Sequence, residues 1–302
     1  DWGRLLVRER SRREGEPSLE VARAWRMLAG AQRRGNQLQE SRKSSRMAEE
    51  ILAALPSPPP DEQIATICDI AEADLDDGRS ERAFQRLELV RRMVEGGSAA
   101  IEAQMKARWQ FLRAACFLAG KRADLAVSDV REVLAAIEAD GAPDDVEALR
   151  ARLLLARAWF SQRDFMAAER LLVQDLEIRR SSPRVTPAEI ATAANFLAEV
   201  CVAQGKYAQA EMEFEQVLAL RRLALGEHDR LVGEAAERLA AFKTSRGDYA
   251  GADPLFRQAL SVAEATYGAE HPRVARILNE LSQMLFAQSR YDQARRLLER
   301  AL

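Results

Sequence analysis

The sequence predicts an all-α protein built as a solenoid of about seven helical hairpins. Two observations lead to this prediction. Ala, Leu, Arg and Glu dominate the 302 residues and favour helix, whereas runs of Val, Ile and Thr with strand alternation are missing. In addition, one motif recurs along the chain at a constant spacing, which is the signature of stacked repeats. A continuous repeat array is therefore favoured over two ordinary domains.

The repeat has a period of 42 residues. Residues 205–214 read GKYAQAEMEF and residues 247–256 read GDYAGADPLF, so Gly, Tyr, Ala, Ala and Phe recur in the same order. Steps of 42 residues, with one step of 43, give a column of small residues, here called the B column: Ser41, Ala83, Ala126, Ala168, Ala210, Ala252 and Ala294. Twelve residues before each lies a second small residue, and these form the A column: Ala29, Ala71, Ala114, Ala156, Ala198, Ala240 and Ser282. Two antiparallel helices need such small residues where they cross closely.

Each repeat is thus predicted to contain a helix A, a short turn and a helix B. Gly205 and Gly247 lie between the two segments, where a helix end favours a positive φ. The predicted pairs are 19–34 with 37–54, 61–77 with 80–95, 99–119 with 122–139, 145–161 with 164–180, 187–203 with 206–223, 229–245 with 248–266, and 271–287 with 290–302.

Turn-forming residues separate the repeats, as in PSPPP at 56–60 and SSPRVTP at 181–187. None of these stretches is long enough to link two domains. We therefore predict a single array over residues 1–302, with an N-terminal segment at 1–18. The predicted repeats are 19–55, 61–96, 98–140, 144–182, 186–225, 228–267 and 270–302.

The repeat motif resembles the tetratricopeptide repeat, in the longer form found in kinesin light chains. The resemblance rests on Leu278-Asn279-Glu280-Leu281, Gly205-Lys206-Tyr207 with Ala210-Glu211, Gln258-Ala259-Leu260, and Tyr267-Gly268 followed by His271-Pro272. It is strong over 187–302, fair from 145, and limited to the small-residue columns before 98. The resemblance implies a right-handed superhelical solenoid whose A helices line a concave groove. It also implies a partner that lies in this groove as an extended peptide or a helix.

Composition and charge argue against several function classes. A net charge of −2 gives no general case for binding nucleic acid or an anionic membrane. No apolar run reaches the roughly 18 to 20 residues that a membrane-spanning helix needs. Cys68, Cys116 and Cys201 are odd in number and far apart, which favours a reducing compartment, so a cytoplasmic location is expected.

No catalytic or metal-binding motif stands out. Phosphate-binding loops, dinucleotide fingerprints, HExxH and GxSxG are missing. The two histidines, His228 and His271, begin A helices, and no set of Cys, Asp and Glu at ligand spacing accompanies them. We therefore expect no enzyme activity, no cofactor and no metal.

Helical periodicity places certain A-helix residues in the groove once the A column is assigned to the core. In the later repeats these are Thr192, Asn195, Glu199, Val202, Glu234, Glu237, Ala241, Arg276, Asn279, Gln283 and Phe286. In the earlier repeats they are Arg23, Arg26, Arg108, Phe111, Ala115, Arg150, Leu153 and Arg157. The residues expected to bind the partner are Asn195, Glu199, Glu237, Asn279, Gln283, Arg150, Arg157 and Arg108.

Two features of this set suggest how a partner would be held. Asn195 and Asn279 occupy the same place in repeats five and seven, and the resemblance implies that Asn there holds the backbone of a bound peptide. Glu237 replaces Asn in repeat six. The arginines are expected to make the N-terminal half of the groove basic, and the glutamates the later half acidic, which would favour a partner of matching asymmetry. The alternative is that these residues form an ordinary solvated surface.

The leading prediction is a non-catalytic scaffold that binds a protein segment. The alternative is a regulatory or sensor module of a larger signalling protein or enzyme, with any catalytic domain outside these residues. The chain starts without Met and stops inside a B helix, whose Leu297, Leu298 and Leu302 would lack a following repeat. We therefore expect a longer natural chain, or an association through this end.

Overall fold

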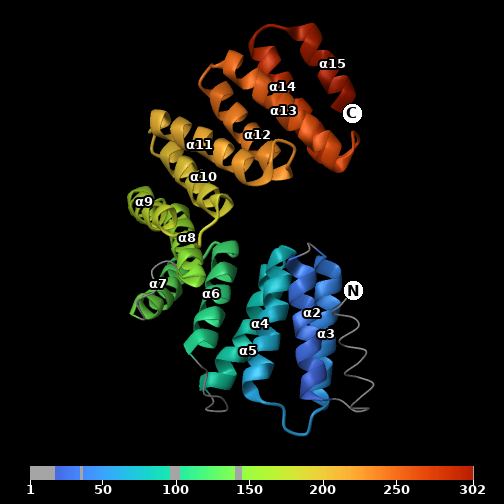
Figure 1. Ribbon diagram of the computed structural model, residues 1–302, viewed down its shortest axis with the longest axis vertical. Coiled ribbons are helices and arrows are strands. Elements are labelled where there is room, and N and C mark those ends of the chain that lie inside the picture. Colours follow the sequence, from blue (N-terminus) through green and yellow to red (C-terminus); the bar gives the residue numbers. More distant parts are fainter. Residues whose placement is uncertain (1–17, 35–36, 96–102, 140–144, 302) are drawn as a thin grey trace. The chain divides into compact units, whose positions relative to one another are not determined.

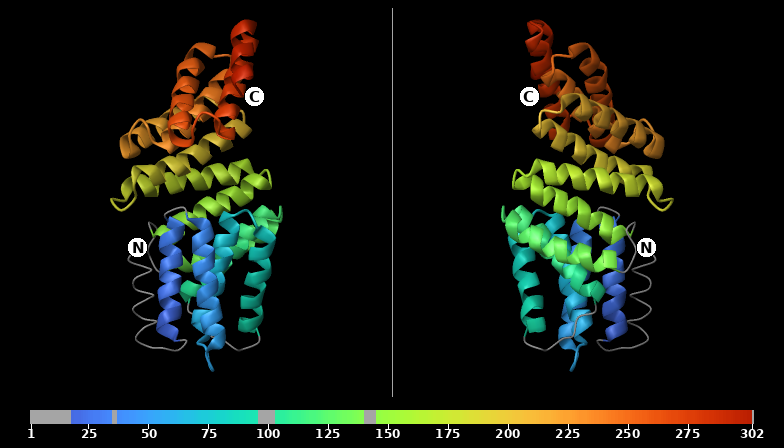
Figure 2. Two further views of the ribbon diagram at one scale, coloured as in Figure 1. Left: turned by 90° about the vertical axis from the view of Figure 1, so that its right-hand side faces the viewer. Right: turned by 90° about the vertical axis from the view of Figure 1, so that its left-hand side faces the viewer.

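The computed structural model describes residues 18–34, 37–95, 103–139 and 145–301 (Figure 1). This part of the chain contains fourteen helices and no strand, which confirms the all-α prediction. Helices that follow one another pack in pairs, as Figures 1 and 2 show for α10 with α11 and for α12 with α13. None of the described helices is long and apolar enough to cross a membrane.

The chain divides into two compact units. Unit 1 comprises residues 1–142 and 150–163, and unit 2 comprises residues 143–149 and 164–302. Unit 1 contains α2 (Leu19–Arg34), α3 (Leu38–Ala54), α4 (Pro60–Asp76), α5 (Ser80–Glu95), α6 (Ala103–Ala119), α7 (Ala123–Ala139) and most of α8 (Val146–Ser161). Unit 2 contains α9 (Phe165–Ser181), α10 (Pro187–Ala203), α11 (Tyr207–Leu225), α12 (Arg230–Ser245), α13 (Tyr249–Tyr267), α14 (Pro272–Ala287) and α15 (Tyr291–Ala301). The single array over 1–302 remains a prediction.

The predicted helix pairs are confirmed to within a few residues at their ends. Pro187–Ala203 begins and ends where predicted, and its N-terminus carries a capping box between Thr186 and Glu189. The predicted helix at 99–119 begins at Ala103, and residues 99–102 lie outside the described part of the chain. The period of the small residues is thus enough to locate the helices.

The two small-residue columns form the core at the crossings of the helices. In the A column, Ala71, Ala114, Ala156, Ala198 and Ala240 have no exposed surface. In the B column the same holds for Ala83, Ala126, Ala168, Ala210 and Ala252. Each fully buried methyl group leaves room for the facing backbone and for larger neighbours such as Leu87, Leu172 and Leu197.

The residue immediately before the A column is Leu or Ile in six repeats and Arg113 in the third, and the structure gives the reason. Its guanidinium donates to both carboxylate oxygens of Asp129 on α7, at 2.7 and 2.6 Å. It also lies 4.4 Å from the centre of the Trp109 ring. A bidentate ion pair therefore replaces an apolar contact between α6 and α7 in the third repeat.

Candidate partner-binding surface

Ion pairs join the three A helices of unit 2 into one surface. Arg238 on α12 pairs with Glu199 on α10. Arg276 on α14 pairs with Glu237 on α12 at 2.8 Å. We call this the unit 2 surface, and define it by Thr192, Asn195, Glu199, Val202, Glu234, Glu237, Arg238, Ala241, Arg276, Asn279, Gln283 and Phe286. Arg238 was not among the predicted residues, although it lies about one repeat after Glu199.

Asn195 is held in a fixed orientation on α10. Its side-chain amide donates to Glu199 Oε1 at 3.0 Å, and the same oxygen accepts from Arg238. The Oδ1 atom of Asn195 is buried and has no hydrogen-bond partner within the described residues. A buried carbonyl oxygen without a donor is costly, so this amide is poised to gain from any donor that reaches it.

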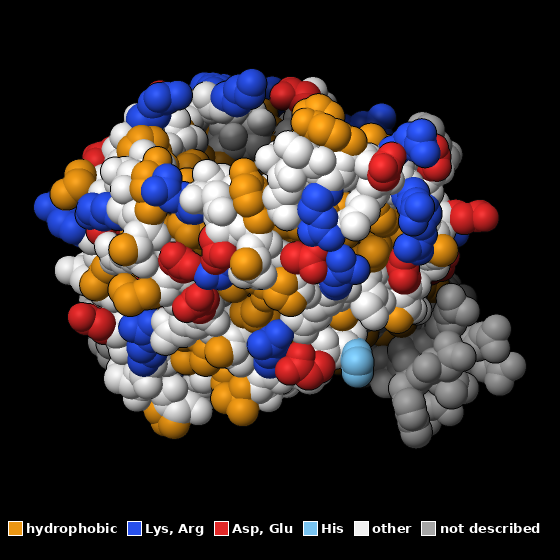
Figure 3. Space-filling model, turned by 90° about the horizontal axis from the view of Figure 1, so that it is seen from above, with side chains coloured by type: hydrophobic (Ala, Val, Ile, Leu, Met, Phe, Trp, Pro, Cys, Tyr) orange, Lys and Arg blue, Asp and Glu red, His pale blue; other side chains and the backbone are white. Residues whose placement is uncertain are grey.

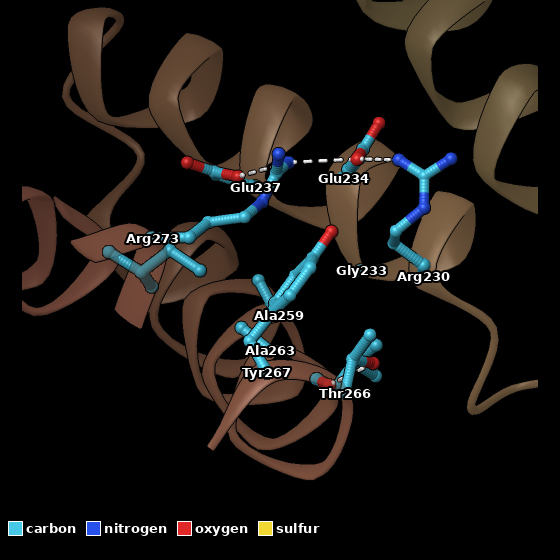
Figure 4. Close-up of a pocket in the computed structure, with 11 residues that line it drawn as sticks. Arg230, Gly233, Glu234, Glu237, Ala259, Ala263, Thr266, Tyr267 and Arg273 are labelled. Atoms are coloured by element: carbon cyan, nitrogen blue, oxygen red, sulfur yellow. Dashed lines mark hydrogen bonds and ion pairs between the residues drawn. The ribbon is translucent and has the colours of Figure 1, made fainter. Parts of the chain in front are cut away.

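Glu237 is buried rather than open to solvent, with 5% of its surface exposed. Burial raises the pKa of its carboxyl group, while Arg276 and Arg273 act in the opposite direction. Figure 4 shows Glu237 and Glu234 beside Arg273 and Arg230, with Arg273 3.1 Å from Glu234 and 3.6 Å from Glu237. The cavity among them measures about 10 Å³, which holds at most one water molecule. Glu237 thus positions the arginines of α14 and does not itself face solvent.

Half of the exposed residues of the unit 2 surface lie on α14. Asn279, Gln283 and Phe286 are exposed at successive turns of this helix, and Phe286 is 64% exposed. Within the described residues, no hydrogen bond of the Asn279 or Gln283 side chain is found. The Phe286 ring makes an edge-on contact with Tyr291 at 5.1 Å. Two free amides and one aromatic ring therefore follow Arg276 along one face of α14.

In unit 1 the A helices are also joined by ion pairs, which centre on α4. Arg26 on α2 pairs with Glu62 at 2.6 Å and with Asp69 at 2.7 Å. Arg108 on α6 pairs with Asp69 at 2.7 Å and with Glu72 at 2.8 Å. Burial alone would lower the pKa of the Arg108 guanidinium. The two carboxylates have the larger combined effect and raise this pKa. We call these residues the unit 1 ladder.

The predicted split into a basic and an acidic half is wrong. Carboxylates of α4 neutralise Arg23, Arg26 and Arg108 in unit 1. Arginines of the neighbouring A helix neutralise Glu199 and Glu237 in unit 2. On the face that Figure 3 shows, basic and acidic side chains are interspersed. The prediction took no residue from the second repeat, and so it missed the acidic side chains of α4.

The two remaining predicted residues lie on α8. Arg150 is half-exposed, 4.0 Å from Glu72, and its guanidinium lies 5.9 Å from the centre of the Phe111 ring. Arg157 is exposed, two turns further along the same helix. Both belong to unit 1, like Arg108 and Glu72. The structure thus brings Arg150 to the end of the unit 1 ladder.

The three cysteines and His271 have structural surroundings. Cys68, Cys116 and Cys201 are free and buried, and burial raises the pKa of their thiols to about 12, 12 and 11. The Nδ1 atom of His271 accepts from the backbone N–H of Arg273 at 3.1 Å and so caps α14, in agreement with a role in the turn. No group of side chains suited to a metal occurs among residues 18–34, 37–95, 103–139 and 145–301.

Two family models match the C-terminal part of the chain, and both describe tetratricopeptide repeats. One covers residues 190–230 and the other covers residues 231–302. They include α10 and all helices that follow it, and therefore the whole unit 2 surface. No curated protein matches the full sequence significantly.

Solved structures with the same fold extend the similarity to most of the chain. A Podosopora anserina protein described as a kinesin light chain with nearly identical TPR-like repeats is 23% identical, with a TM-score of 0.58, over 67% of this chain and 95% of that one. The Rap conjugation gene regulator of plasmid pLS20, in complex with the Phr* peptide, is 13% identical, with a TM-score of 0.63, over 94% of this chain and 73% of that one.

A third solved structure is a longer protein. It is a signal transduction ATPase with numerous domains and a tetratricopeptide repeat sensor from Pyrococcus horikoshii, 12% identical with a TM-score of 0.69. The similarity covers 93% of this chain but 41% of that one. At these identities the similarity concerns the fold alone. The family models thus identify residues 190–302 as tetratricopeptide repeats, and the solved structures show that the same fold extends over most of the chain.

Proposed function

We propose that the chain is a non-catalytic scaffold whose unit 2 surface binds a peptide or helical segment of a partner protein. The observation that carries the proposal is the pair of free amides at Asn279 and Gln283. They lie on a surface where the charged side chains already have partners. An amide can donate and accept at once, so it suits the unpaired backbone groups of an extended peptide.

Each residue has a separate role in this proposal. Asn279 and Gln283 bind the peptide backbone, and Phe286 contacts an apolar side chain of the peptide. Asn195 supplies an acceptor through its Oδ1 atom, which has no donor within the described residues. Glu237 holds Arg276 in place. In unit 1, Arg108, Arg150 and Arg157 contribute to partner binding. The proposal includes no cofactor and places the protein in the cytoplasm.

The test uses a peptide selected from a random phage-displayed library against the full chain. Isothermal titration then compares wild type with Asn279→Ala. We expect the variant to bind roughly threefold to tenfold more weakly, which corresponds to one lost hydrogen bond. Its melting temperature should stay close to that of wild type, because exposed substitutions change stability by no more than about 0.5 kcal/mol.

The matched control is Gln293→Ala, which removes an exposed amide from the B helix α15. It should bind the peptide as wild type does. Equal affinity of Asn279→Ala and wild type, or an equal loss in both variants, would show that the A-helix surface is not the binding site. The double variant Arg150→Ala/Arg157→Ala, titrated in the same way, tests whether unit 1 takes part.

The alternative is a sensor module of a larger protein, and one comparison favours it. In the Pyrococcus horikoshii ATPase, repeats of the same fold occur as a sensor within a longer chain. This role needs the same binding surface, so the titration above applies to both. The two differ in whether peptide binding changes the activity of an attached domain in the natural full-length protein.

A further inference from the structure

One position of the B helix holds a buried arginine in two successive repeats. It lies eleven residues after the B column and is Arg179 on α9 and Arg221 on α11. Arg179 donates to the carbonyl oxygen of Leu149 at 2.8 Å, and Arg221 donates to that of Leu231 at 2.9 Å. Both residues are less than 10% exposed. Arg179 reaches the A helix of its own repeat, α8, whereas Arg221 reaches the A helix of the following repeat, α12. The fifth repeat therefore has room for a guanidinium between its B helix and the next A helix.

In the first repeat the same position is Leu52 on α3, and a cavity lies beside it. The cavity measures about 180 Å³ and is bounded by the end of α3, Pro58 and the first two turns of α4. Leu52 is shorter than arginine and carries no donor. Arg221 fills the space between its B helix and the next A helix, whereas no side chain fills the equivalent space between α3 and α4.

The walls of this cavity suit a long side chain with a cationic end. Leu52, Ala53, Pro58 and Ile67 present apolar surface along which a methylene stem can pack. Glu49 lines the same cavity, and its side chain is 42% exposed. Its Oε1 atom accepts from Arg86 at 3.0 Å, which leaves acceptor positions on the other carboxylate oxygen.

The other polar groups of the cavity already have partners. The Gln63 amide donates to the carbonyl oxygen of Pro58 at 3.0 Å. The Thr66 hydroxyl donates to the carbonyl oxygen of Glu62 at 2.8 Å. Glu49 is the one charged residue among those that line the cavity, and although Arg86 pairs with its Oε1 atom, its other oxygen can accept from a second cationic group.

We infer that this cavity binds an arginine side chain of a partner protein. The inference does not depend on the unit 2 surface, because every residue that lines the cavity belongs to unit 1. Arginine is favoured over lysine because Arg221 occupies the equivalent place between α11 and α12. In addition, a planar guanidinium can donate to a carboxylate through two N–H groups at once.

The first test titrates Nα-acetyl-arginine N-methylamide into the isotope-labelled full chain. The control ligand is the citrulline analogue, which has the same shape and no charge. We expect the arginine ligand to shift the backbone amide signals of Thr66 and Ile67 in a saturable way, and the citrulline ligand to bind at least tenfold more weakly. Equal shifts from both ligands, or no saturable shift from either, would overturn the inference.

The second test fills the cavity from within. Leu52→Arg should fold with an unchanged or higher melting temperature and should no longer respond to the arginine ligand. Leu87→Arg is the matched control, because Leu87 has no exposed surface and lines no such cavity, and this variant should unfold. Should Leu52→Arg unfold as Leu87→Arg does, the cavity does not fit an arginine. Glu49→Gln, which keeps Leu52, should weaken the arginine ligand at least tenfold, and an unchanged affinity would also contradict the inference.

Discussion

At the scale of the residue, the turn between helix A and helix B has one position that requires a left-handed backbone. Gly78, Gly205 and Gly247 have φ values of 73°, 76° and 81° there. Non-glycine residues stand at the same position in three other repeats: Lys121, Arg163 and Ser289, with φ values of 59°, 64° and 59°. A Cβ added at the three glycines would meet no atom within 4 Å. The conformation alone therefore disfavours a side chain.

We predict that Arg163→Gly stabilises the protein by about 0.5–1 kcal/mol, since relief of the left-handed strain exceeds the entropy cost of glycine. Thermal unfolding measures the change. Arg170→Gly is the control, because Arg170 is an exposed residue inside α9, and this variant should lose about 1 kcal/mol. A loss of stability in Arg163→Gly would mean that the turn does not hold this conformation.

The ion pair of Arg113 and Asp129 gives a second prediction at this scale. Asp129 is 8% exposed, so Arg113→Leu leaves a buried carboxylate without its partner and should cost about 3–5 kcal/mol. Leu155 and Leu171 occupy the equivalent positions in the fourth repeat. The double variant Arg113→Leu/Asp129→Leu should therefore recover most of the stability in chemical denaturation. If the loss in the double variant equals the sum of the losses in Arg113→Leu and Asp129→Leu, the two residues do not act as a pair.

At the scale of the element, α12 and α13 pack closely at Gly233. A Cβ on Gly233 would lie 2.8 Å from Val262 Cγ1, which is closer than side chains pack. We predict that Gly233→Ala costs about 1–3 kcal/mol, because the helices must move apart.

A double-mutant cycle, measured by denaturant unfolding, tests this reason directly. In a Val262→Ala background the 2.8 Å contact with Cγ1 is gone and only the 3.0 Å contact with Cβ remains, so the cost of Gly233→Ala should be clearly smaller. The same cost in both backgrounds would mean that the close approach to Val262 is not the cause.

The helices themselves could be predicted from the sequence because their cause is local and periodic. One small residue per helix fixes the register, and Ala198 and Ala210 are fully buried as expected. The charge of the surface could not be derived in this way. Arg26 and Asp69 are 43 residues apart, and Glu199 and Arg238 are 39 apart, so each pair joins consecutive A helices. A comparison of A helices one repeat apart would have revealed these pairs, whereas single helices do not.

At the scale of the whole molecule, both units combine uniform packing with variable A-helix side chains. The crossings repeat the same small residues in unit 1 and in unit 2. The A helices differ: unit 1 carries the acidic centre of α4, whereas unit 2 carries amides and Phe286 on α14. Buried Glu237 shows the limit of helical periodicity, since its repeat position is equivalent to those of Asn195 and Asn279 but it is buried and paired with Arg276. Exposure depends on the neighbouring helix as well as on the position within a helix.

The central claim is that a partner segment binds to the A helices of unit 2. The most direct measurement maps the backbone amide signals of the labelled chain during titration with the selected peptide. We predict saturable shifts at positions of the unit 2 surface on α10, α12 and α14, including Asn195 and Asn279, with α11, α13 and α15 nearly unchanged. Shifts concentrated on α11, α13 and α15, with α14 unaffected, would contradict the account.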